Sequence, residues 1–256
     1  MQAENFVLQD YFDRIGYTGA ARADLATVQG MMRRQLFTVP FENLDVQAGK
    51  IVSLVPEEIV DKIVGRRRGG YCYEVNGLFA MALQALGIDY QFVAARPMFY
   101  PVKRPKTHMA LVLTLDGVQC LCDLGFGSYG IRAPLRLDQL DSELRQDDDS
   151  FMLSKSGEID YVLKAKVDGE WQNQYGFNLS PQEWIDFMPA NYLNSTHPDA
   201  IFVQKLLVVI FSEEGRSILL DDSLRTVRGG MSQRRQVAPD QRQALLREVF
   251  GLDTAH

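Results

Sequence analysis

The sequence predicts an α+β protein in which a helical N-terminal region is followed by an antiparallel β region and then by a region of mixed character. Up to residue 87 the apolar residues recur at helical spacing. Between residues 90 and 175 the pattern changes to short β-rich runs, interrupted by the turn dipeptides Asp116-Gly117 and Asp168-Gly169. From Pro181 onward helical and strand patterns alternate. These changes of pattern suggest three domains, residues 1–88, 89–186 and 187–256.

The composition is that of an ordinary globular protein, because 46% of the 256 residues are hydrophobic, 23% are charged and the net charge is −6. A mildly acidic balance gives no electrostatic reason to bind nucleic acid or an anionic membrane. The sequence has no apolar run long enough to span a bilayer, and residues 1–5 lack the basic and apolar regions of a signal peptide. We therefore expect a cytoplasmic protein without a nucleic-acid or membrane partner.

Three helices are predicted before the glycine pair at residues 69 and 70. The first has an apolar stripe that begins at Leu8 and stops at Gly16. Asp24 is a suitable N-cap for the second helix, and Pro56 is a suitable first residue for the third. Between these two helices Pro40 interrupts the helical pattern, because a proline holds the residue before it in extended geometry.

A cysteine stands at the start of the next predicted helix. Cys72 follows Gly69 and Gly70, and an apolar stripe then continues to a predicted glycine cap at Gly87. Near a helix start, free backbone N–H groups and the helix dipole favour the reactive thiolate of a cysteine. We expect the glycine pair to leave room for a substrate at the sulfur. A small buried cysteine after a turn would give the same local pattern, so the interpretation depends on a partner base.

The other two cysteines are not expected to react or to bind metal. Three cysteines in a chain without a secretion signal do not indicate a disulfide framework. Cys120 and Cys122 are two residues apart in a strand-like run, which suits neither a relaxed disulfide nor a zinc site. We interpret them as small apolar side chains of the core. The acidic run at residues 146–150 is predicted to be a solvated loop, so no metal is expected.

A histidine and an aspartate are predicted to meet across a hairpin. His108 precedes a strongly apolar run that leads into Asp116-Gly117, a strong signal for a two-residue hairpin loop. A loop of two residues sets Ala110 opposite Asp123. Because side chains alternate along a strand, His108 and Asp123 then become diagonal neighbours on one face of the hairpin. A carboxylate among apolar residues is costly without a partner, and the hairpin supplies one.

Cys72, His108 and Asp123 together supply a nucleophile, a base and a residue that orients the base. The carboxylate would fix the tautomer of the imidazole and would stabilise the imidazolium beside a thiolate. Each of the three residues also has an ordinary interpretation by itself, as a core cysteine, a core histidine or a turn aspartate. Their combination predicts a catalytic triad.

The C-terminal region alternates between helix and strand. We expect a helix over residues 182–188, strands over 205–211 and 217–220, and a last helix over 239–250 that Gly251 caps. No internal repeat and no flexible linker is visible, so the domain boundaries rest on the change of pattern alone.

The motifs resemble those of the arylamine N-acetyltransferase family, and they occur in the family's order at similar spacing. The similarity extends from about residue 8 to residue 251. It rests on Tyr11-Phe12-Asp13-Arg14-Ile15, Pro40-Phe41-Glu42-Asn43-Leu44, Arg68-Gly69-Gly70-Tyr71-Cys72-Tyr73-Glu74-Val75-Asn76-Gly77, Thr107-His108, Asp123-Leu124-Gly125-Phe126-Gly127 and Asn191-Tyr192-Leu193-Asn194-Ser195-Thr196-His197-Pro198. The resemblance implies that the middle domain is an antiparallel β-barrel-like domain and that the small α/β C-terminal domain acts as a lid.

The resemblance also implies roles for individual residues. Cys72, His108 and Asp123 match the family's cysteine–histidine–aspartate triad. The further residues are Glu42 and Arg68 as a supporting ion pair, Asn76 as a hydrogen-bond partner near the triad, Phe126 and Ser128 in the amine pocket, and Thr107, Gly127 and Phe202 near coenzyme A. The chain ends soon after Phe250-Gly251, whereas many members of the family continue, so we expect a less covered coenzyme A cleft.

The implied activity is the transfer of an acetyl group from acetyl-CoA, a co-substrate, to the nitrogen of a small arylamine or arylhydrazine. Reaction through an acetyl-cysteine predicts ping-pong kinetics without a metal. Two other activities are compatible with the same triad. One is a cysteine hydrolase, and the other is a macrolactam-forming amide synthase of the same fold, which takes its acyl group from a carrier-bound chain. A non-catalytic binding module is a third alternative, which the intact triad disfavours.

Overall fold

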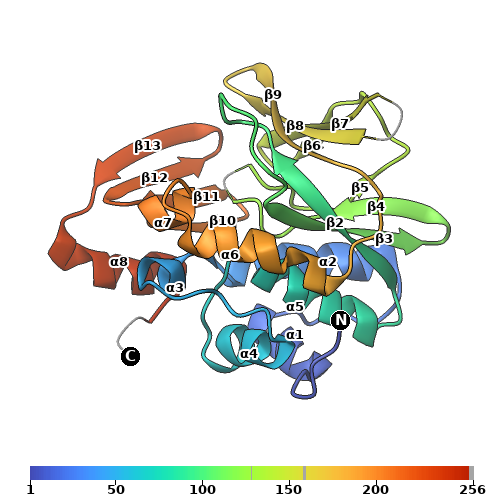
Figure 1. Cartoon of the computed structure of the whole chain (residues 1–256), viewed down its shortest axis with the longest axis horizontal. Helices are drawn as coiled ribbons and strands as arrows, with labels where there is room; N and C mark the ends of the chain where they lie inside the picture. Colours follow the sequence, from blue (N-terminus) through green and yellow to red (C-terminus); the bar gives the residue numbers. More distant parts are fainter. Residues whose placement is uncertain (128, 158–159, 254–256) are drawn as a thin grey trace.

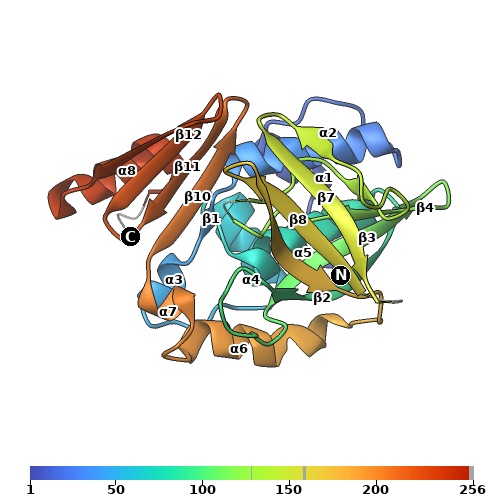
Figure 2. The same cartoon turned by 90° about the horizontal axis from the view of Figure 1, so that it is seen from above.

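The computed structural model describes residues 1–127, 129–157 and 160–253, and in these ranges it has the predicted α+β architecture. Two sheets lie side by side above the N-terminal helices (Figures 1 and 2). The N-terminal part contains α1 (Leu8–Ile15), α2 (Leu25–Thr38), the short strand β1 (Phe41–Glu42), α3 (Leu44–Gln47), α4 (Pro56–Val60), the π-helix η1 (Asp61–Gly65) and α5 (Cys72–Ala85). None of the described helices is long and apolar enough to cross a membrane.

The predicted helix ends are confirmed. Gly16 after α1 and Gly87 after α5 have φ angles of +66° and +70°, the left-handed conformation that glycine adopts without a steric penalty. The side chain of Asp24 accepts a hydrogen bond of 2.8 Å from the backbone N–H of Thr27, which satisfies one of the free donors at the start of α2.

The helix that Pro56 opens has two parts. α4 continues without a break into η1, where the backbone N–H of Arg66 bonds to the carbonyl of Asp61, five residues earlier. A π-turn of this kind inserts one extra residue into a helix and is frequent at functional sites. The side chain of Lys62, in this wider turn, is buried.

Helix α5 is buried on all sides, whereas its apolar pattern predicted a single buried face. Each residue from 72 to 83 is buried. The reason is that α5 lies between two layers, with α1 and α4 against one side and the strands β2 (Asp89–Pro97) and β3 (His108–Leu115) against the other. A helix that neighbours cover all round forms the centre of a core rather than its surface.

The eight-stranded sheet forms the predicted antiparallel middle region, and it curls (Figure 2). Every named pair of strands in it is antiparallel. In spatial order the strands are β5 (Leu135–Arg136), β4 (Val118–Cys122), β3, β2, β9 (Glu170–Phe177), β8 (Asp160–Val167), β7 (Asp149–Ser156) and β6 (Leu144–Gln146).

The hairpin between β3 and β4 has the predicted register. Leu115 pairs with Val118, and the ladder runs back to the pair formed by Leu111 and Cys122. β4 ends there, one residue before Asp123, so the expected pairing of Asp123 with a residue of β3 is not formed. Asp123 instead begins the loop that leaves the sheet. Its side chain still reaches His108, as described below.

The acidic run at residues 146–150 was predicted as a solvated loop, and this is wrong. It forms the turn between β6 and β7. The carboxylate of Asp149 is buried and accepts hydrogen bonds from Arg132 and Arg216, and Asp147 pairs with Arg33. The run is therefore an ionic contact between distant parts of the chain, which local composition does not reveal.

A five-stranded antiparallel sheet holds the C-terminal strands together with one strand from the N-terminal part of the chain. The order is β1, β10 (Leu207–Ser212), β11 (Gly215–Leu220), β12 (Ser223–Arg228) and β13 (Met231–Gln236). β1 pairs with β10, so this sheet contains residues from both the 1–88 and the 187–256 ranges. The division of the chain at residues 88 and 186 stays a prediction. β12 and β13 were not predicted. β13 is exposed throughout, so it has no apolar face that would indicate a strand.

The C-terminal helices are α6 (Met188–Thr196), α7 (Ile201–Gln204) and α8 (Arg242–Phe250), with 3₁₀ turns at η2 (Trp184–Phe187) and η3 (Pro239–Gln241). The last predicted helix and its cap are confirmed, since Gly251 has a φ of +65°. The helix expected at residues 182–188 starts later and continues to Thr196. The polar side chains along α6 obscure it in the sequence, because several of them are buried.

A buried arginine joins three parts of the helical region. The guanidinium of Arg14, on α1, donates hydrogen bonds of 2.7, 2.9 and 3.1 Å to the backbone carbonyls of Ile63, Thr38 and Arg68. Burial and the positive charge of Arg67 lower the pKa of Arg14 to about 10. The carbonyls that it satisfies lie at or near helix ends, where helical partners are missing.

We predict that Arg14→Met lowers the free energy of unfolding by about 2–4 kcal/mol, because it leaves buried carbonyls without a donor. Urea denaturation followed by circular dichroism measures the change. Arg66→Met is the matched control: Arg66 pairs with Asp61 at the surface, so its loss should change the free energy of unfolding by less than about 1 kcal/mol. An equal effect of the two substitutions would contradict the assigned role of Arg14.

Candidate active site

Cys72 is the first residue of α5, as the sequence predicted. It is 2% exposed, and the N-cap is Tyr71. The backbone N–H of a residue in this position has no partner within its own helix, so it is free to donate to a group beside the sulfur. The positive end of the helix dipole also lies here.

The glycine pair before Cys72 does not leave room for a substrate, contrary to expectation. A Cβ atom on Gly69 would lie 2.1 Å from the carbonyl oxygen of Pro40, and one on Gly70 would lie 2.7 Å from the side chain of Glu74. The space is filled by the protein itself. The glycines let the segment before α5 pass close to β1, where the backbone N–H of Glu42 bonds to the carbonyl of Gly70.

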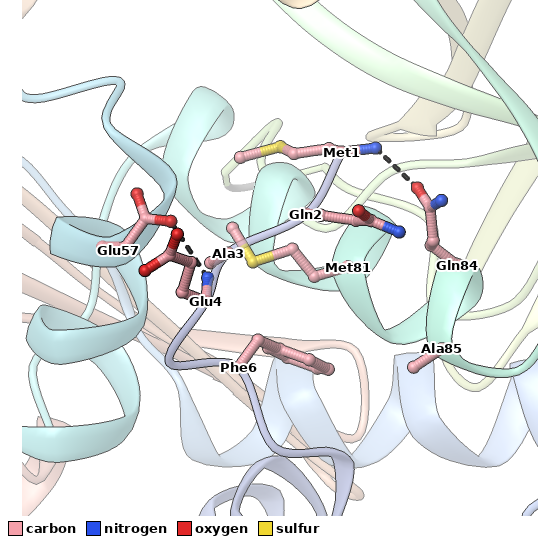
Figure 3. A pocket seen from close by; sticks show the side chains of 9 residues that line it. All are labelled: Met1, Gln2, Ala3, Glu4, Phe6, Glu57, Met81, Gln84 and Ala85. Atoms are coloured by element: carbon pink, nitrogen blue, oxygen red, sulfur yellow. Dashed lines mark hydrogen bonds between the residues drawn. The ribbon is translucent and has the colours of Figure 1, made fainter.

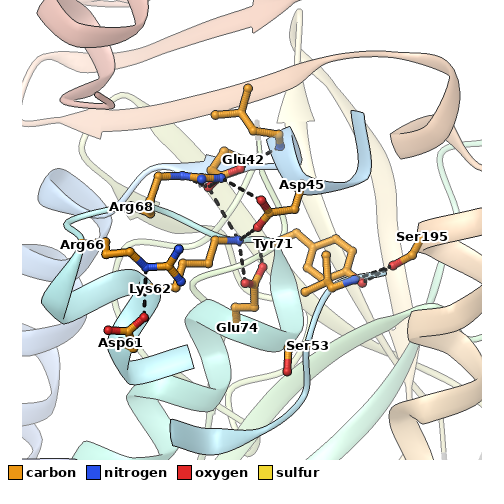
Figure 4. Close-up of polar contacts among 12 residues, drawn as sticks. Glu42, Asp45, Ser53, Asp61, Lys62, Arg66, Arg68, Tyr71, Glu74 and Ser195 are labelled. Atoms are coloured by element: carbon orange, nitrogen blue, oxygen red, sulfur yellow. Dashed lines mark hydrogen bonds and ion pairs between the residues drawn. The ribbon is translucent and has the colours of Figure 1, made fainter. Parts of the chain in front are cut away.

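A buried ionic cluster holds the start of α5 (Figure 4). One oxygen of Glu74 accepts a 3.0 Å hydrogen bond from the backbone N–H of Tyr71, and the other contacts the ammonium of Lys62 at 2.7 Å. Lys62 also lies 2.6 Å from Asp45 and 3.7 Å from Glu42. The ammonium therefore connects α5, the π-helix and the segment around β1.

The predicted ion pair between Arg68 and Glu42 forms part of this cluster, at 2.7 Å. Burial raises the pKa of Glu74 to about 7, against the opposing effect of Lys62. Burial lowers the pKa of Lys62, but the carboxylates of Glu74, Glu42 and Asp45 outweigh it and raise that pKa. Sequence reasoning missed Lys62; the only available signal was a lysine on the apolar side of a helix.

His108 and Asp123 meet as the hairpin register predicted, with 2.7 Å between His108 Nε2 and Asp123 Oδ2. Both side chains are buried. Burial lowers the pKa of His108, but the Asp123 carboxylate and a hydrogen bond with Cys72 raise it to about 10. The ring is therefore an imidazolium at neutral pH. Because Nε2 faces Asp123, Nδ1 is the nitrogen left to exchange a proton with Cys72.

Asn76 joins the loop of Asp123 to α5. Its side-chain N–H group donates to Asp123 Oδ1 at 3.1 Å and to the carbonyl of Met109 at 2.8 Å, and its oxygen accepts from the backbone N–H of Leu124 at 2.8 Å. Gly125 then passes so close to α5 that a Cβ atom on it would lie 2.5 Å from Cys72 Cα. The expected hydrogen bonding of Asn76 near the triad is therefore present.

The other expected site residues lie at varying distances from this centre. The ring of Phe126 is 5.1 Å from that of His108 and 4.8 Å from that of Tyr175. Phe202 packs on the ring of Tyr71 at 5.7 Å. Thr107 directly precedes His108, Gly127 ends the described part of the Asp123 loop, and Ser128 lies outside the described residues.

Tyr175, which sequence reasoning missed, is buried with its ring 5.0 Å from that of His108.

A cavity of about 350 Å³ lies elsewhere, between the N-terminal residues and the far end of α5 (Figure 3). Met1, Phe6, Met81 and Gln84 are among the residues that line it, and none of Cys72, His108 and Asp123 does. Met81 is nine residues along α5 from Cys72, about 14 Å at 1.5 Å per residue. This cavity is therefore separate from the candidate active site.

Known proteins resemble this chain over most of its length. A family model described as N-acetyltransferase matches residues 24–256, which makes the protein an acyltransferase. An arylamine N-acetyltransferase of Mycolicibacterium smegmatis is 33% identical, over 88% of this chain and 84% of its own. An arylamine N-acetyltransferase of Mycobacterium tuberculosis is 35% identical, over 97% of this chain and 90% of its own. The chain belongs to the arylamine N-acetyltransferase family, as its motifs predicted.

Solved structures of the family have the same fold. The arylamine N-acetyltransferase from M. tuberculosis matches with a TM-score of 0.92 and 34% identity, over 98% of this chain and 94% of that one. The enzyme from Mycobacterium marinum in complex with CoA matches with a TM-score of 0.92 and 32% identity, over 97% and 94%. These likenesses confirm the predicted fold class.

The raised pKa of His108 predicts how stability depends on pH. A histidine with a raised folded-state pKa stabilises the protein fully below its unfolded value of 6.5, and this stabilisation is lost as pH rises toward the folded value. If Cys72 is a thiolate in the folded protein, the proton that it loses offsets the proton that His108 gains, and the pH dependence disappears. The test therefore uses a Cys72→Ala background. There we expect the free energy of unfolding to fall between pH 7 and 9, by up to about 1.4 kcal/mol per pH unit, relative to Cys72→Ala/His108→Gln.

Urea denaturation at each pH measures this difference. Cys72→Ala/His197→Gln is the control, because His197 is exposed and its Nδ1 accepts a hydrogen bond from the backbone N–H of Asp199. Parallel pH curves for the His108→Gln variant and its parent would contradict a raised pKa of His108.

Proposed function

We propose that the protein transfers an acetyl group from acetyl-CoA to the nitrogen of an arylamine or arylhydrazine, through an acetyl-cysteine at residue 72. The observation that carries this proposal is the buried His108–Asp123 pair beside Cys72 at the first position of α5. An imidazolium and a helix N-terminus both favour a thiolate. The names of the relatives support acetyl transfer and arylamine acceptors, and the CoA complex of the M. marinum enzyme supports the donor.

In the first half-reaction the thiolate of Cys72 attacks the thioester carbonyl of acetyl-CoA. The backbone N–H of Cys72 donates to the oxyanion that forms, since it has no helical partner. The bond between the carbonyl carbon and the CoA sulfur then breaks, and the departing sulfur takes the proton of His108. The products are acetyl-Cys72, free CoA and a neutral His108.

In the second half-reaction the nitrogen of the amine attacks the acetyl-cysteine. His108, now neutral, accepts the proton that the amine loses, and Asp123 stabilises the imidazolium that forms again. The carbon–sulfur bond breaks and Cys72 returns as a thiolate beside a protonated His108. Because CoA leaves before the amine reacts, the kinetics are ping-pong.

The surroundings of the triad support these substrates. The rings of Phe126 and Tyr175 pack around His108, and Phe99 packs against Phe126 at 5.8 Å with half of its surface exposed, which suits a flat aromatic amine. We assign Phe126 and Ser128 to the amine site, and Thr107, Gly127 and Phe202 to the vicinity of CoA.

The loop before Thr107 carries Lys103, Arg104 and Lys106, cations that suit the phosphates of CoA.

Incubation with acetyl-CoA followed by intact-mass measurement tests the proposal. We expect the mass of one acetyl group on the wild type and on Cys120→Ser, the control with an equally buried cysteine, and none on Cys72→Ser. The adduct should disappear when an arylamine is added. Peptide cleavage without an adduct would favour the cysteine hydrolase. Acylation by a carrier-bound chain and not by acetyl-CoA would favour the macrolactam-forming amide synthase.

We further predict that Asp123→Asn slows acetylation of Cys72 by about 10³–10⁴-fold, because the substitution removes the charge that stabilises the imidazolium and sets its tautomer. Rapid quenching and mass spectrometry measure the rate. Asp138→Asn, which changes an exposed carboxylate paired with Arg136, is the control and should react at the wild-type rate. Loss of folded protein, seen by circular dichroism, would instead assign Asp123 a structural role.

A further inference from the structure

Helix α6 carries buried polar residues that the proposed mechanism does not use. Asn191, Asn194 and Ser195 are 3%, 5% and 5% exposed. Their spacing of three and four residues sets them on one face of the helix. The other side of the helix is open to solvent at Pro189, Tyr192 and Thr196. α6 lies along one edge of the molecule, so its polar face points toward the interior (Figure 2). A buried polar face needs partners, and these partners are next to the triad.

One partner is the peptide that precedes the catalytic base. The side-chain N–H group of Asn194 donates a 2.9 Å hydrogen bond to the carbonyl of Thr107, the residue before His108. The hydroxyl of Tyr73, the residue after Cys72, donates to the same carbonyl, also at 2.9 Å. A single carbonyl therefore receives one donor from α6 and one from α5.

The other partner is the residue that precedes the nucleophile. The hydroxyl of Tyr71 bonds to the side-chain oxygen of Asn191. It also lies 3.2 Å from the hydroxyl of Ser195 (Figure 4). Both α6 residues also bond to the backbone of Val52, which holds them in place. Burial raises the pKa of the Tyr71 and Tyr73 hydroxyls well above the usual value, so both remain protonated donors.

We propose that α6 sets the position of His108 relative to Cys72, with Asn194 as a positioning residue that holds the Thr107 carbonyl and with Asn191 and Ser195 holding Tyr71. The inference rests on the proposed function for its catalytic meaning. Its physical basis is geometric: Cys72 lies between two tyrosines whose hydroxyls are bound to α6 or to the peptide before His108. A displacement of about 1 Å between reacting groups costs on the order of 100-fold in rate.

The arrangement makes a specific prediction about paired substitutions. Asn194→Ala and Tyr73→Phe each remove one of two donors to the same carbonyl, so the remaining donor still holds it. We expect each single variant to lose about 10-fold in the rate of Cys72 acetylation at saturating acetyl-CoA. The double variant should lose about 10³-fold, more than the product of the single effects, because coupled residues are not additive. The concentration of acetyl-CoA that gives half the maximal rate should not change.

A second readout does not depend on acetyl-CoA. Iodoacetamide alkylates the thiolate of a cysteine, so its rate at pH 7 reports whether the imidazolium is beside Cys72. We expect Asn194→Ala and Tyr73→Phe each to slow alkylation of Cys72, and the double variant to slow it further, as for acetylation. Thr196→Ala is the control: its hydroxyl bonds within α6 to the carbonyl of Tyr192, so the variant should match the wild type in both assays.

The outcomes separate the inference from the proposed function. Slower alkylation in the variants supports the inference even if the wild type takes no acetyl group from acetyl-CoA, which would overturn only the proposed function. Wild-type rates of alkylation and acetylation in both Asn194→Ala and Tyr73→Phe would overturn the inference while leaving the proposed function intact. If Asn194→Ala does not fold, Tyr73→Phe tests the same carbonyl with a near-isosteric change.

Discussion

The start of helix α5 depends on one buried carboxylate, that of Glu74. It satisfies the backbone N–H of Tyr71 with one oxygen and neutralises the ammonium of Lys62 with the other. Removing one partner of a buried pair leaves an uncompensated charge, which costs about 3–5 kcal/mol. In the folded protein each buried charge has an opposite charge beside it, because Asp45, Glu42 and Arg68 complete the cluster. The helix N-terminus, and with it Cys72, is thereby held by five charged groups rather than by local sequence alone.

His108 is held near Cys72 through a second constraint, the close approach of the Asp123 loop to α5. Asn76 bonds to three groups of the β3–β4 hairpin and of the loop that follows it, and only a glycine fits at position 125. The eight-stranded sheet carries His108, whereas the central helix carries Cys72. Their relative position is therefore a property of the packing between two layers, which the polar face of α6 supports from a third side.

Much of the fold and the pairing within the site could be predicted because the signals are local. The apolar stripes, the glycine caps at Gly16 and Gly251 and the N-cap at Asp24 each act over a few residues. The loop at Asp116-Gly117 fixes the register of the β3–β4 hairpin, and this register predicted that Asp123 reaches His108, although the ladder ends one residue before Asp123. The predictions were wrong where a polar pattern was taken for a solvated surface, as in the acidic turn that buries Asp149.

The sequence by itself determined the α+β class, most helix ends, the hairpin and the identity of the three candidate triad residues, because periodicity and turn chemistry depend on neighbours along the chain. Only the tertiary structure decided which charges surround Lys62, that the glycine pair admits β1 rather than a substrate, and that the buried polar residues of α6 bond beside Cys72 and His108. The contact between Asn194 and Thr107 joins residues 87 positions apart. A buried polar group must find a partner, but nothing in its local sequence states which distant group the packing will bring within reach.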